Sequence, residues 1–367
     1  MALLEIEGLV VRFRTHEGTI HAVNGVSFQV DEGETLGLVG ESGCGKSVTS
    51  LALMRLLPSP AGHVEGGRVR LDGTELLDLT EAEMRDLRGR ELAMIFQDPM
   101  TSLNPVLTIA EQMVETIRAH TQMTAEQATA RAVELLGMVG IPRPETRLKA
   151  FPHEFSGGMR QRVMIAMALA LHPRLLIADE PTTALDVTIQ AQVLELLRAL
   201  TADSGTAVIL ITHDLGVVAG MTRRINVMYA GYIVETAPTA ELFAHPAHPY
   251  TVGLLHSIPR LDAVEGEPLI PIEGTPPDQR RAPVGCPFAP RCAWRLAACW
   301  STNPPLEPLV TGMPVVLTGD RATHRIACLN PPTPEEAAAG LPLREGFAAA
   351  PAPGSVVDEL ATVEAPA

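Results

Sequence analysis

Gly40-Glu41-Ser42-Gly43-Cys44-Gly45-Lys46-Ser47 is the stretch of sequence that decides the fold. It has the pattern G-x-x-x-x-G-K-S, in which glycines let backbone N–H groups surround phosphates, the lysine reaches the β- and γ-phosphates, and the serine ligates Mg²⁺. An apolar run at residues 35–39 precedes the loop, and residues 47–57 follow with helical spacing up to Pro58. Strand, glycine loop and helix in this order predict a phosphate-binding loop in an α/β fold.

A dinucleotide-binding loop is the alternative reading of such a glycine-rich turn. That fold needs the spacing G-x-G-x-x-G, in which the third glycine allows close packing of helix and strand. Here Gly43 and Gly45 supply the first two glycines, but Val48 occupies the third position. The sequence therefore disfavours a dinucleotide site.

Two carboxylates, Asp179 and Glu180, follow an apolar run at residues 175–178. A second such run covers residues 207–211, with a predicted helix at 189–200 between them, as expected of parallel strands covered on both faces. Chemistry in α/β sheets lies at the carboxyl ends of strands. We expect Asp179 to hold Mg²⁺ together with Ser47, and Glu180 to polarise a water for attack on the γ-phosphorus. An ordinary acidic turn before Pro181 is the alternative.

The segment 155–162, Phe-Ser-Gly-Gly-Met-Arg-Gln-Arg, resembles the signature motif of ABC ATPases. Ser156 and the N–H groups of Gly157 and Gly158, at the start of a predicted helix, can bind a γ-phosphate. The resemblance implies that this phosphate belongs to ATP on the opposite subunit of a dimer. Met159 replaces the commoner glutamine, a variation that leaves the phosphate-binding atoms untouched.

Further elements of this family occur in the expected order. Gln97 resembles the Q-loop glutamine, which senses the γ-phosphate and metal; Asp186 lies in a D-loop at 183–186; and His213 resembles the switch histidine. Phe13 resembles the aromatic residue that stacks on adenine, although a core phenylalanine fits equally. The resemblance implies catalytic roles for Glu180, His213 and Gln97, and Mg²⁺ ligation by Ser47, Gln97 and Asp179. The implied ATP-binding residues are Phe13, Gly40, Glu41, Ser42, Gly43, Cys44, Gly45, Lys46, Ser47, Val48, Gln97, Ser156, Gly157, Gly158, Asp179, Asp186 and His213.

The fold class that this resemblance implies is α/β. We expect a P-loop NTPase domain of the ABC type over residues 1–245, with a RecA-like parallel sheet core, an N-terminal antiparallel β subdomain and a helical subdomain at about 98–170. A loop-rich C-terminal domain with four cysteines is expected at 246–330, where prolines multiply. Residues 331–367, rich in Ala, Pro and Glu, are expected to form a disordered tail.

Four of the five cysteines lie in the C-terminal part of the chain: Cys286, Cys292, Cys299 and Cys328. Four thiolates could bind a metal, but their spacing matches neither a zinc ribbon nor a ferredoxin, so zinc, iron–sulfur and free thiols stay open. The region from Tyr250 to Cys328 is similar to the C-terminal domain of oligopeptide/dipeptide importer ATPases. This resemblance implies a 4Fe–4S cluster, with zinc as the alternative.

Composition restricts the partners and the location. The net charge is −15, which argues against nucleic acid, since a nucleic-acid-binding protein usually carries a basic face. The longest apolar run, residues 163–171, is far too short to span a bilayer. The first residues are acidic where a signal peptide would be basic and then apolar. We therefore expect a peripheral protein at the cytoplasmic face of the cell membrane.

The run at residues 95–105 also resembles the peptide-importer ATPases, in particular the first of their two paired ATPases. The resemblance implies an ATPase that couples ATP hydrolysis to uptake of di- or oligopeptides. The implied partners are two transmembrane permease subunits, a second homologous ATPase or a second copy, and an extracytoplasmic peptide-binding protein. Import of nickel, glutathione or another small solute is the alternative. A non-transport ABC protein lacks support, because it would need a long coiled-coil insertion or a second nucleotide domain, and a P-loop kinase does not need the signature motif.

Overall fold

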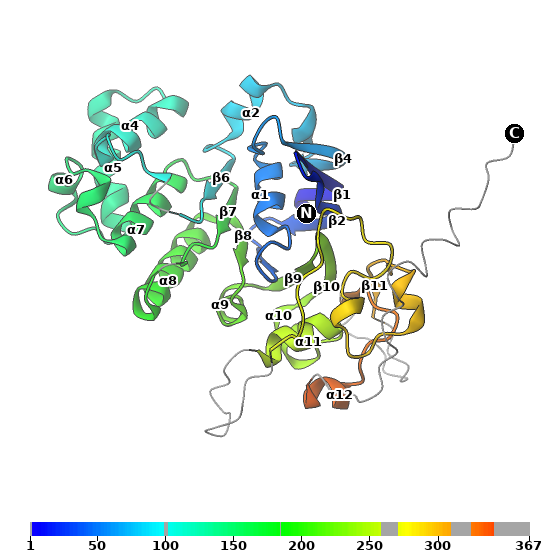
Figure 1. Ribbon diagram of the computed structural model, residues 1–367. Helices are drawn as coiled ribbons and strands as arrows, with labels where there is room; N and C mark the ends of the chain where they lie inside the picture. The colour runs from blue at the N-terminus through cyan, green and yellow to red at the C-terminus, as the bar shows by residue number, and fades with distance from the viewer. Residues whose placement is uncertain (1, 99–101, 184, 258–270, 310–323, 341–367) are drawn as a thin grey trace, which may run out of the picture.

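The structure is a computed structural model that describes residues 2–98, 102–183, 185–257, 271–309 and 324–340. A central sheet has the helical layer of α4 to α7 on one side and the C-terminal segment, residues 271–309 and 324–340, on the other (Figure 1). Helix α1, Lys46–Leu53, contacts strands of a second, antiparallel sheet as well as β7 of the central one. This helix thus packs against both sheets.

The central sheet has eight strands in the order β11-β12-β10-β9-β3-β8-β7-β6. Strands β9, β3, β8, β7 and β6 are mutually parallel, and the others are antiparallel. Every residue of β7 and β8 is buried, as expected of parallel strands covered on both faces. The predicted parallel core is confirmed. The parallel strands are β3 (Thr35–Val39), β6 (Leu92–Ile95), β7 (Leu175–Asp179), β8 (Ala207–Thr212) and β9 (Arg224–Tyr229), and β10 (Tyr232–Pro238) runs antiparallel beside β9.

The second sheet is four-stranded and antiparallel, in the order β2-β1-β4-β5. Leu4, Ile6 and Val69 point into a core shared with α1 and one face of the central sheet. This is the expected N-terminal antiparallel subdomain. Its strands are β1 (Ala2–Thr15), β2 (Gly18–Asp31), β4 (Gly62–Leu71) and β5 (Thr74–Glu75).

The helical layer lies between β6 and β7 in the sequence. Thr108 and Thr124 each form a capping box at a helix start, in which the side chain accepts from the third helical N–H. Apolar residues such as Met113 and Leu136 face a common core. The layer's helices are α4 (Ile109–His120), α5 (Ala125–Met138), α6 (Pro144–Arg147) and α7 (Gly157–Ala168).

The other helices flank the sheets or follow them. Helix α1 is shorter than the predicted 47–57, because Arg55 adopts a left-handed backbone with φ 51° that ends the helix before Pro58. Helix α8 ends at Gly205, whose φ of 68° forms a left-handed cap. The remaining bounds are α2 (Glu81–Leu87), α8 (Val187–Ser204), α9 (Leu215–Met221), α10 (Thr239–Ala244), α11 (Pro249–His256) and α12 (Pro334–Ala339).

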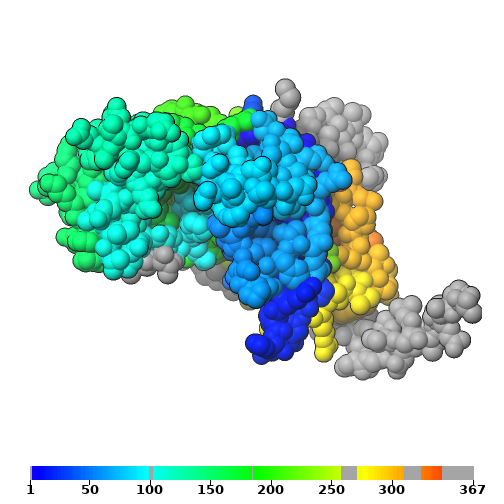
Figure 2. All heavy atoms as spheres, turned by 90° about the horizontal axis from the view of Figure 1, so that it is seen from above, coloured from blue at the N-terminus to red at the C-terminus, as the bar shows by residue number. Residues whose placement is uncertain are grey.

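The C-terminal segment continues the central sheet. Strand β12, Arg325–Ile326, pairs with β10, and β11, Glu307–Pro308, pairs with β12. Beside this edge the fully buried carboxylate of Glu235 accepts hydrogen bonds from the N–H groups of Ala247 and His248 and contacts His324 Nε2 at 2.6 Å. Figure 2 shows the segment against one end of the molecule, with the helical layer at the other end.

The expected disordered tail from residue 331 needs correction over its first ten residues. Thr333 caps helix α12 in a capping box, and His256 Nε2 lies 3.0 Å from the carbonyl oxygen of Ala337. These contacts order the chain as far as Gly340 because they satisfy the backbone groups at both ends of the short helix. Residues 341–367, like 99–101 and Ala184 of the predicted Q-loop and D-loop regions, lie outside the described residues. Among the helices of the described ranges, none has the length and apolar character to cross a bilayer.

Candidate active site

The glycine loop connects β3 to α1, and two of its glycines are required by close backbone approach. Gly40 has φ 154° and Gly45 has φ 108°. A Cβ atom at Gly40 would lie 2.2 Å from the carbonyl oxygen of Met228, and one at Gly45 would lie 2.4 Å from that of Ala22. Both contacts are with backbone, which cannot move aside cheaply. The loop is therefore seated tightly between β2 and the end of β9.

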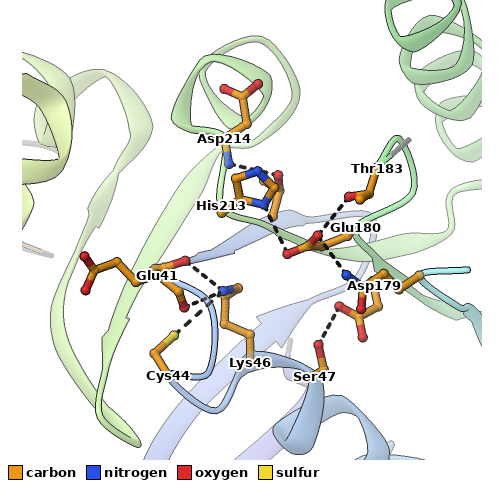
Figure 3. A network of polar contacts seen from close by, with 12 residues as sticks. Glu41, Cys44, Lys46, Ser47, Asp179, Glu180, Thr183, His213 and Asp214 are labelled. Carbon is orange, nitrogen blue, oxygen red and sulfur yellow. Dashed lines mark hydrogen bonds and ion pairs between the residues drawn. The ribbon is translucent and has the colours of Figure 1, made fainter. Parts of the chain in front are cut away.

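Lys46 lies at the start of α1 with only 4% of its surface exposed. Its ammonium group donates to the carbonyl oxygens of Gly40 at 2.7 Å and Glu41 at 3.0 Å, and lies 3.8 Å from the sulfur of Cys44 (Figure 3). Burial raises the pKa of the Cys44 thiol, partly offset by the Lys46 charge. The lysine thus rests on its own loop, within reach of the space where phosphates would lie.

Ser47 and Asp179 meet across the interface between α1 and β7. The Ser47 hydroxyl donates to Asp179 Oδ1 at 3.0 Å, and Asp179 is 4% exposed. Burial raises the pKa of Asp179, and the nearby Glu180 charge adds to this, against the hydrogen bond from Ser47 and the charge of Lys46. A hydroxyl and a carboxylate side by side are hard oxygen ligands that suit Mg²⁺, which needs only one or two protein ligands beside phosphate and water.

Glu180 follows β7 in a left-handed backbone conformation, with φ 45°. Its Oε2 atom accepts from Gln97 Nε2 at 3.1 Å and from the Thr183 hydroxyl at 2.8 Å, and its Oε1 atom lies 3.2 Å from His213 Nδ1. The N–H of Glu180 donates to the carbonyl of Ile211 at the end of β8. Residues that follow β6 and β8, both distant in sequence, and the nearby Thr183 thus orient one carboxylate.

The pKa of Glu180 lies below its ordinary value. Burial would raise this pKa, but hydrogen bonds from Thr183 and His213 and the charges of His213 and Lys46 outweigh burial. The Glu180 side chain is 12% exposed, whereas His213 is 60% exposed. The lowered pKa keeps this shielded carboxylate ionised, so that it can accept a proton from a water molecule.

The signature motif lies away from this cluster. Ser156 caps α7 by accepting from the N–H of Met159, and Gly157 and Gly158 form the first turn. A Cβ atom at Gly158 would lie 2.6 Å from Cγ2 of Ile189, so α8 packs closely here. In the view of Figure 1, α7 and α1 lie on opposite sides of β6. Within one chain, the predicted signature residues therefore do not join the glycine loop.

The remaining predicted residues have structural contacts of their own. Asp186 caps α8 by accepting from the N–H of Ile189 at 3.0 Å. Phe13, on β1, packs on the core beside Gly62 and is half-buried, so its stacking on adenine stays a prediction. Ser42 and Gly43 are exposed on the loop, and Val48 packs against the core from α1.

Sequence reasoning missed two residues that contact Glu41, in the glycine loop, from outside the expected ATP-binding domain. Arg291 pairs with the carboxylate of Glu41, and the Tyr250 hydroxyl accepts from the Glu41 N–H. No local pattern marks either one. The only signal was the position of Arg291 between two cysteines of a segment otherwise poor in core residues.

The four C-terminal cysteines come together on the C-terminal segment. The N–H of Cys286 donates to the carbonyl of Cys299, and burial raises the pKa of Cys286 and Cys292 and raises that of Cys328 to about 12, with neighbouring thiols contributing. All the cysteines are unpaired thiols. Across the ranges that the structure describes, no group of three or more His, Cys, Asp or Glu side chains has the arrangement of a metal site. The thiols are gathered, but the iron–sulfur prediction receives no support from their geometry.

Two parts of the chain match known protein families. Residues 23–183 match the ABC transporter family, and residues 234–299 match the C-terminal region of oligopeptide/dipeptide transporters. The oligopeptide transport ATP-binding protein OppD of Bacillus subtilis (strain 168) is 54% identical over 304 residues, 83% of this chain and 85% of that protein. The dipeptide transport ATP-binding protein DppD of the same organism is 53% identical over 297 residues, 81% of this chain and 88% of that protein. A dimeric ATP-binding cassette bound to ADP and Pi after hydrolysis is similar with a TM-score of 0.58 and 28% identity, over 64% of this chain and 98% of that one.

Proposed function

The chain belongs to the family of ABC-transporter ATP-binding proteins that includes those of oligopeptide and dipeptide transport, and on this premise we propose that it hydrolyses ATP to drive peptide uptake. The observation that carries the proposal is the cluster of Lys46, Ser47, Asp179 and Glu180 at the carboxyl ends of β3 and β7 (Figure 3). Together these residues supply a phosphate cradle, a metal-binding pair and an ionised base.

In this proposal Glu180 acts as the general base. Its carboxylate accepts a proton from a water molecule as the water oxygen bonds to the γ-phosphorus, and the bond to the β-phosphate oxygen breaks to give ADP and phosphate. Gln97 and Thr183 orient the carboxylate through Oε2, which leaves Oε1 to face the water once His213 moves toward phosphate. Lys46 would leave the two loop carbonyls for the β- and γ-phosphates.

The metal pair of this site would be Ser47 and Asp179. They already touch through a hydrogen bond of 3.0 Å, so the hydroxyl oxygen and the carboxylate share one side of the cradle. Gln97, which donates to Glu180, would take part through a water. Mg²⁺ bound there would neutralise charge that develops on the transferred phosphoryl group.

A dimer completes the proposed site. The signature residues Ser156, Gly157 and Gly158 lie at the N-terminus of α7, away from the chain's own glycine loop, and a helix N-terminus is suited to bind phosphate. Head-to-tail pairing with a homologous ATPase, or with a second copy, would bring them to the γ-phosphate of the partner's ATP. The similar ATP-binding cassette is dimeric, which supports a dimer here.

The proposed partners are two transmembrane permease subunits, which would hold this chain at the cytoplasmic face of the membrane, and an extracytoplasmic peptide-binding protein. The substrate class, di- or oligopeptides, rests on the relatives' names and on the matched C-terminal region. The test is co-purification from membranes, followed by ATP-dependent uptake of labelled peptides into reconstituted vesicles. Uptake of nickel or glutathione without uptake of peptides would select the alternative substrates.

For the cysteines we propose a metal-binding role, with a 4Fe–4S cluster first and zinc second. The support is only the chemistry of the side chains: Cys286, Cys292, Cys299 and Cys328 are soft ligands on one loop-rich segment, although the described side chains do not have the arrangement of a metal site. When bound, such a cluster would crosslink the segment. Anaerobic purification with iron and zinc analysis tests the role, and a chain that carries neither metal at stoichiometric level would contradict it.

A further inference from the structure

Glu41, the second residue of the glycine loop, is held at each of its polar groups. Its N–H donates to the hydroxyl of Tyr250 at 2.7 Å, and its carboxylate accepts from Arg291. Its carbonyl oxygen accepts from the Lys46 ammonium at 3.0 Å (Figure 3). One residue thus links the lysine to two side chains that lie outside residues 1–245.

Arg291 is the stronger of the two contacts. Its guanidinium binds both carboxylate oxygens of Glu41, at 2.6 and 3.0 Å, in the bidentate geometry that only arginine provides. It also donates to the carbonyl oxygens of Ile272 and Glu273, at 3.1 and 2.9 Å. The Arg291 side chain is 4% exposed and that of Glu41 is 28% exposed. The pair is therefore shielded from water, and its geometry is fixed on both sides.

Tyr250 provides a rigid second contact. It is fully buried and packs on Tyr229 and Phe288, with ring centroids 4.6 and 5.4 Å away. Farther along the loop, the amide of Gln279 donates to the carbonyl of Gly43 at 2.8 Å. Residues from α11 and from the C-terminal segment thus contact the outer face of the loop at three points.

We propose that Arg291 is a positioning residue for ATP binding, which acts through Glu41 to keep the glycine loop and Lys46 in the geometry that phosphates require. The physical reason is preorganisation: a loop already held in its binding conformation loses less conformational entropy when the nucleotide binds. Removal of Arg291 also leaves a carboxylate without its cation next to the site of an anionic ligand. This inference rests on the proposed function, because it assumes that the loop binds ATP.

The test compares MgATP binding and hydrolysis by the full chain and by the variants Arg291→Ala, Arg291→Lys and Glu41→Gln. Arg291→Ala should raise the Kd and KM for MgATP on the order of tenfold, with kcat changed less than about twofold. Arg291→Lys, whose ammonium group lacks the bidentate fork, should have Kd and KM values between those of the unmodified chain and those of Arg291→Ala. Because Arg291 acts through Glu41, the two substitutions should not add. The Kd of the double variant Arg291→Ala/Glu41→Gln for MgATP should be no higher than that of the single variant with the higher Kd.

Arg280→Ala is the matched control. Arg280 also joins the C-terminal region to the N-terminal sheet, through Glu17 at 3.0 Å, but it does so on the surface, and its side chain pairs with Glu17 and Asp278 and not with Glu41. The substitution Arg280→Ala should leave the Kd and KM for MgATP unchanged. Thermal unfolding of every variant separates loss of fold from loss of binding, and if Arg291→Ala does not fold, Arg291→Lys and Glu41→Gln carry the comparison.

Two results would overturn the inference: an unchanged KM in folded Arg291→Ala, or a rise in KM together with a fall in kcat well beyond about twofold. Lys46→Ala distinguishes these from failure of the proposed function. If Lys46→Ala abolishes MgATP binding while the Arg291 variants bind normally, the ATP site stands and the positioning role is wrong. If the unmodified chain itself binds no MgATP, the proposed function fails first.

Discussion

Nδ1 of His213 lies 3.2 Å from Oε1 of Glu180, so the exposed imidazole and the shielded carboxylate contact each other. The other carboxylate oxygen is held by Gln97 and Thr183. These contacts lower the pKa of Glu180 against the effect of burial. The proposed base is therefore held by residues of its own chain, so dimer formation would have to supply only the partner's signature motif.

Glu180→Gln should lower kcat for ATP hydrolysis by about 100-fold or more, since the amide cannot accept the proton of the attacking water. MgATP binding should persist, because the amide keeps the shape and the contact to Thr183. Phosphate release and equilibrium nucleotide binding measure the two effects. Glu195→Gln, at an exposed glutamate of α8 paired with Arg198, is the control. Normal turnover in the Glu180 variant would remove this residue from the mechanism.

Lys46→Ala should abolish nucleotide binding without loss of the fold. The ammonium group contacts only its own loop, through the carbonyls of Gly40 and Glu41 and the sulfur of Cys44, so it contributes little to packing between elements. Circular dichroism tests whether the fold is retained, and binding of a fluorescent ATP analogue tests whether nucleotide binding is lost. Lys149, the other lysine of the chain, is exposed, and Lys149→Ala should behave like the unmodified protein. Retained binding in Lys46→Ala would contradict the assignment.

Asp179→Asn should abolish Mg²⁺-dependent hydrolysis and raise the thermal stability of the nucleotide-free chain by about 2 °C or more. Burial raises the pKa of Asp179, so the folded state binds this proton more tightly than the unfolded state, and the ionised carboxylate destabilises the fold above the raised pKa. The difference in Tm between the two proteins should be small below about pH 4 and widen as the pH rises through the folded pKa. Calorimetry over pH 4 to 8 measures it, and a destabilised variant at neutral pH would refute the explanation.

Glu235→Ala should destabilise the C-terminal edge of the sheet. The carboxylate accepts from two backbone N–H groups and contacts His324 at 2.6 Å, with all atoms buried. Removal of one partner of such a buried pair costs about 3 to 5 kcal/mol, because the others stay desolvated without an acceptor. Urea unfolding and limited proteolysis should show early release of residues after 324. Glu307→Ala, at an exposed residue of β11, is the control and should not cause this early release.

Local patterns predicted the elements that carry the ATP site. The apolar runs at 35–39, 175–178 and 207–211 became β3, β7 and β8, because continuous burial needs little beyond hydrophobic side chains of strand length. Strand β9, which pairs with β3 in the middle of the sheet, was not foreseen, since pairing between residues 36–39 and 224–227 depends on the whole topology. The early end of α1 depends on one backbone angle at Arg55, which sequence spacing does not encode.

The active site shows the same division. Its motif residues were identified because each type performs a chemistry that few others can, as with the Ser47 hydroxyl and the Asp179 carboxylate. Arg291 and Tyr250 were missed because arginine and tyrosine are common on surfaces and in cores alike. Only the fold brings them within 3 Å of a loop some 200 residues away in sequence.

The pairing of β12 with β10 has a practical consequence for protein engineering. A fragment cut at residue 245, which the motifs alone would suggest as a minimal ATPase, would bare the hydrogen-bonding edge of β10 and leave the carboxylate of Glu235 without His324. Open strand edges recruit other chains, so such a truncation should aggregate when expressed. A working minimal unit would have to extend at least through Ile326. The C-terminal segment is thus expected to protect the ATP-binding domain from aggregation.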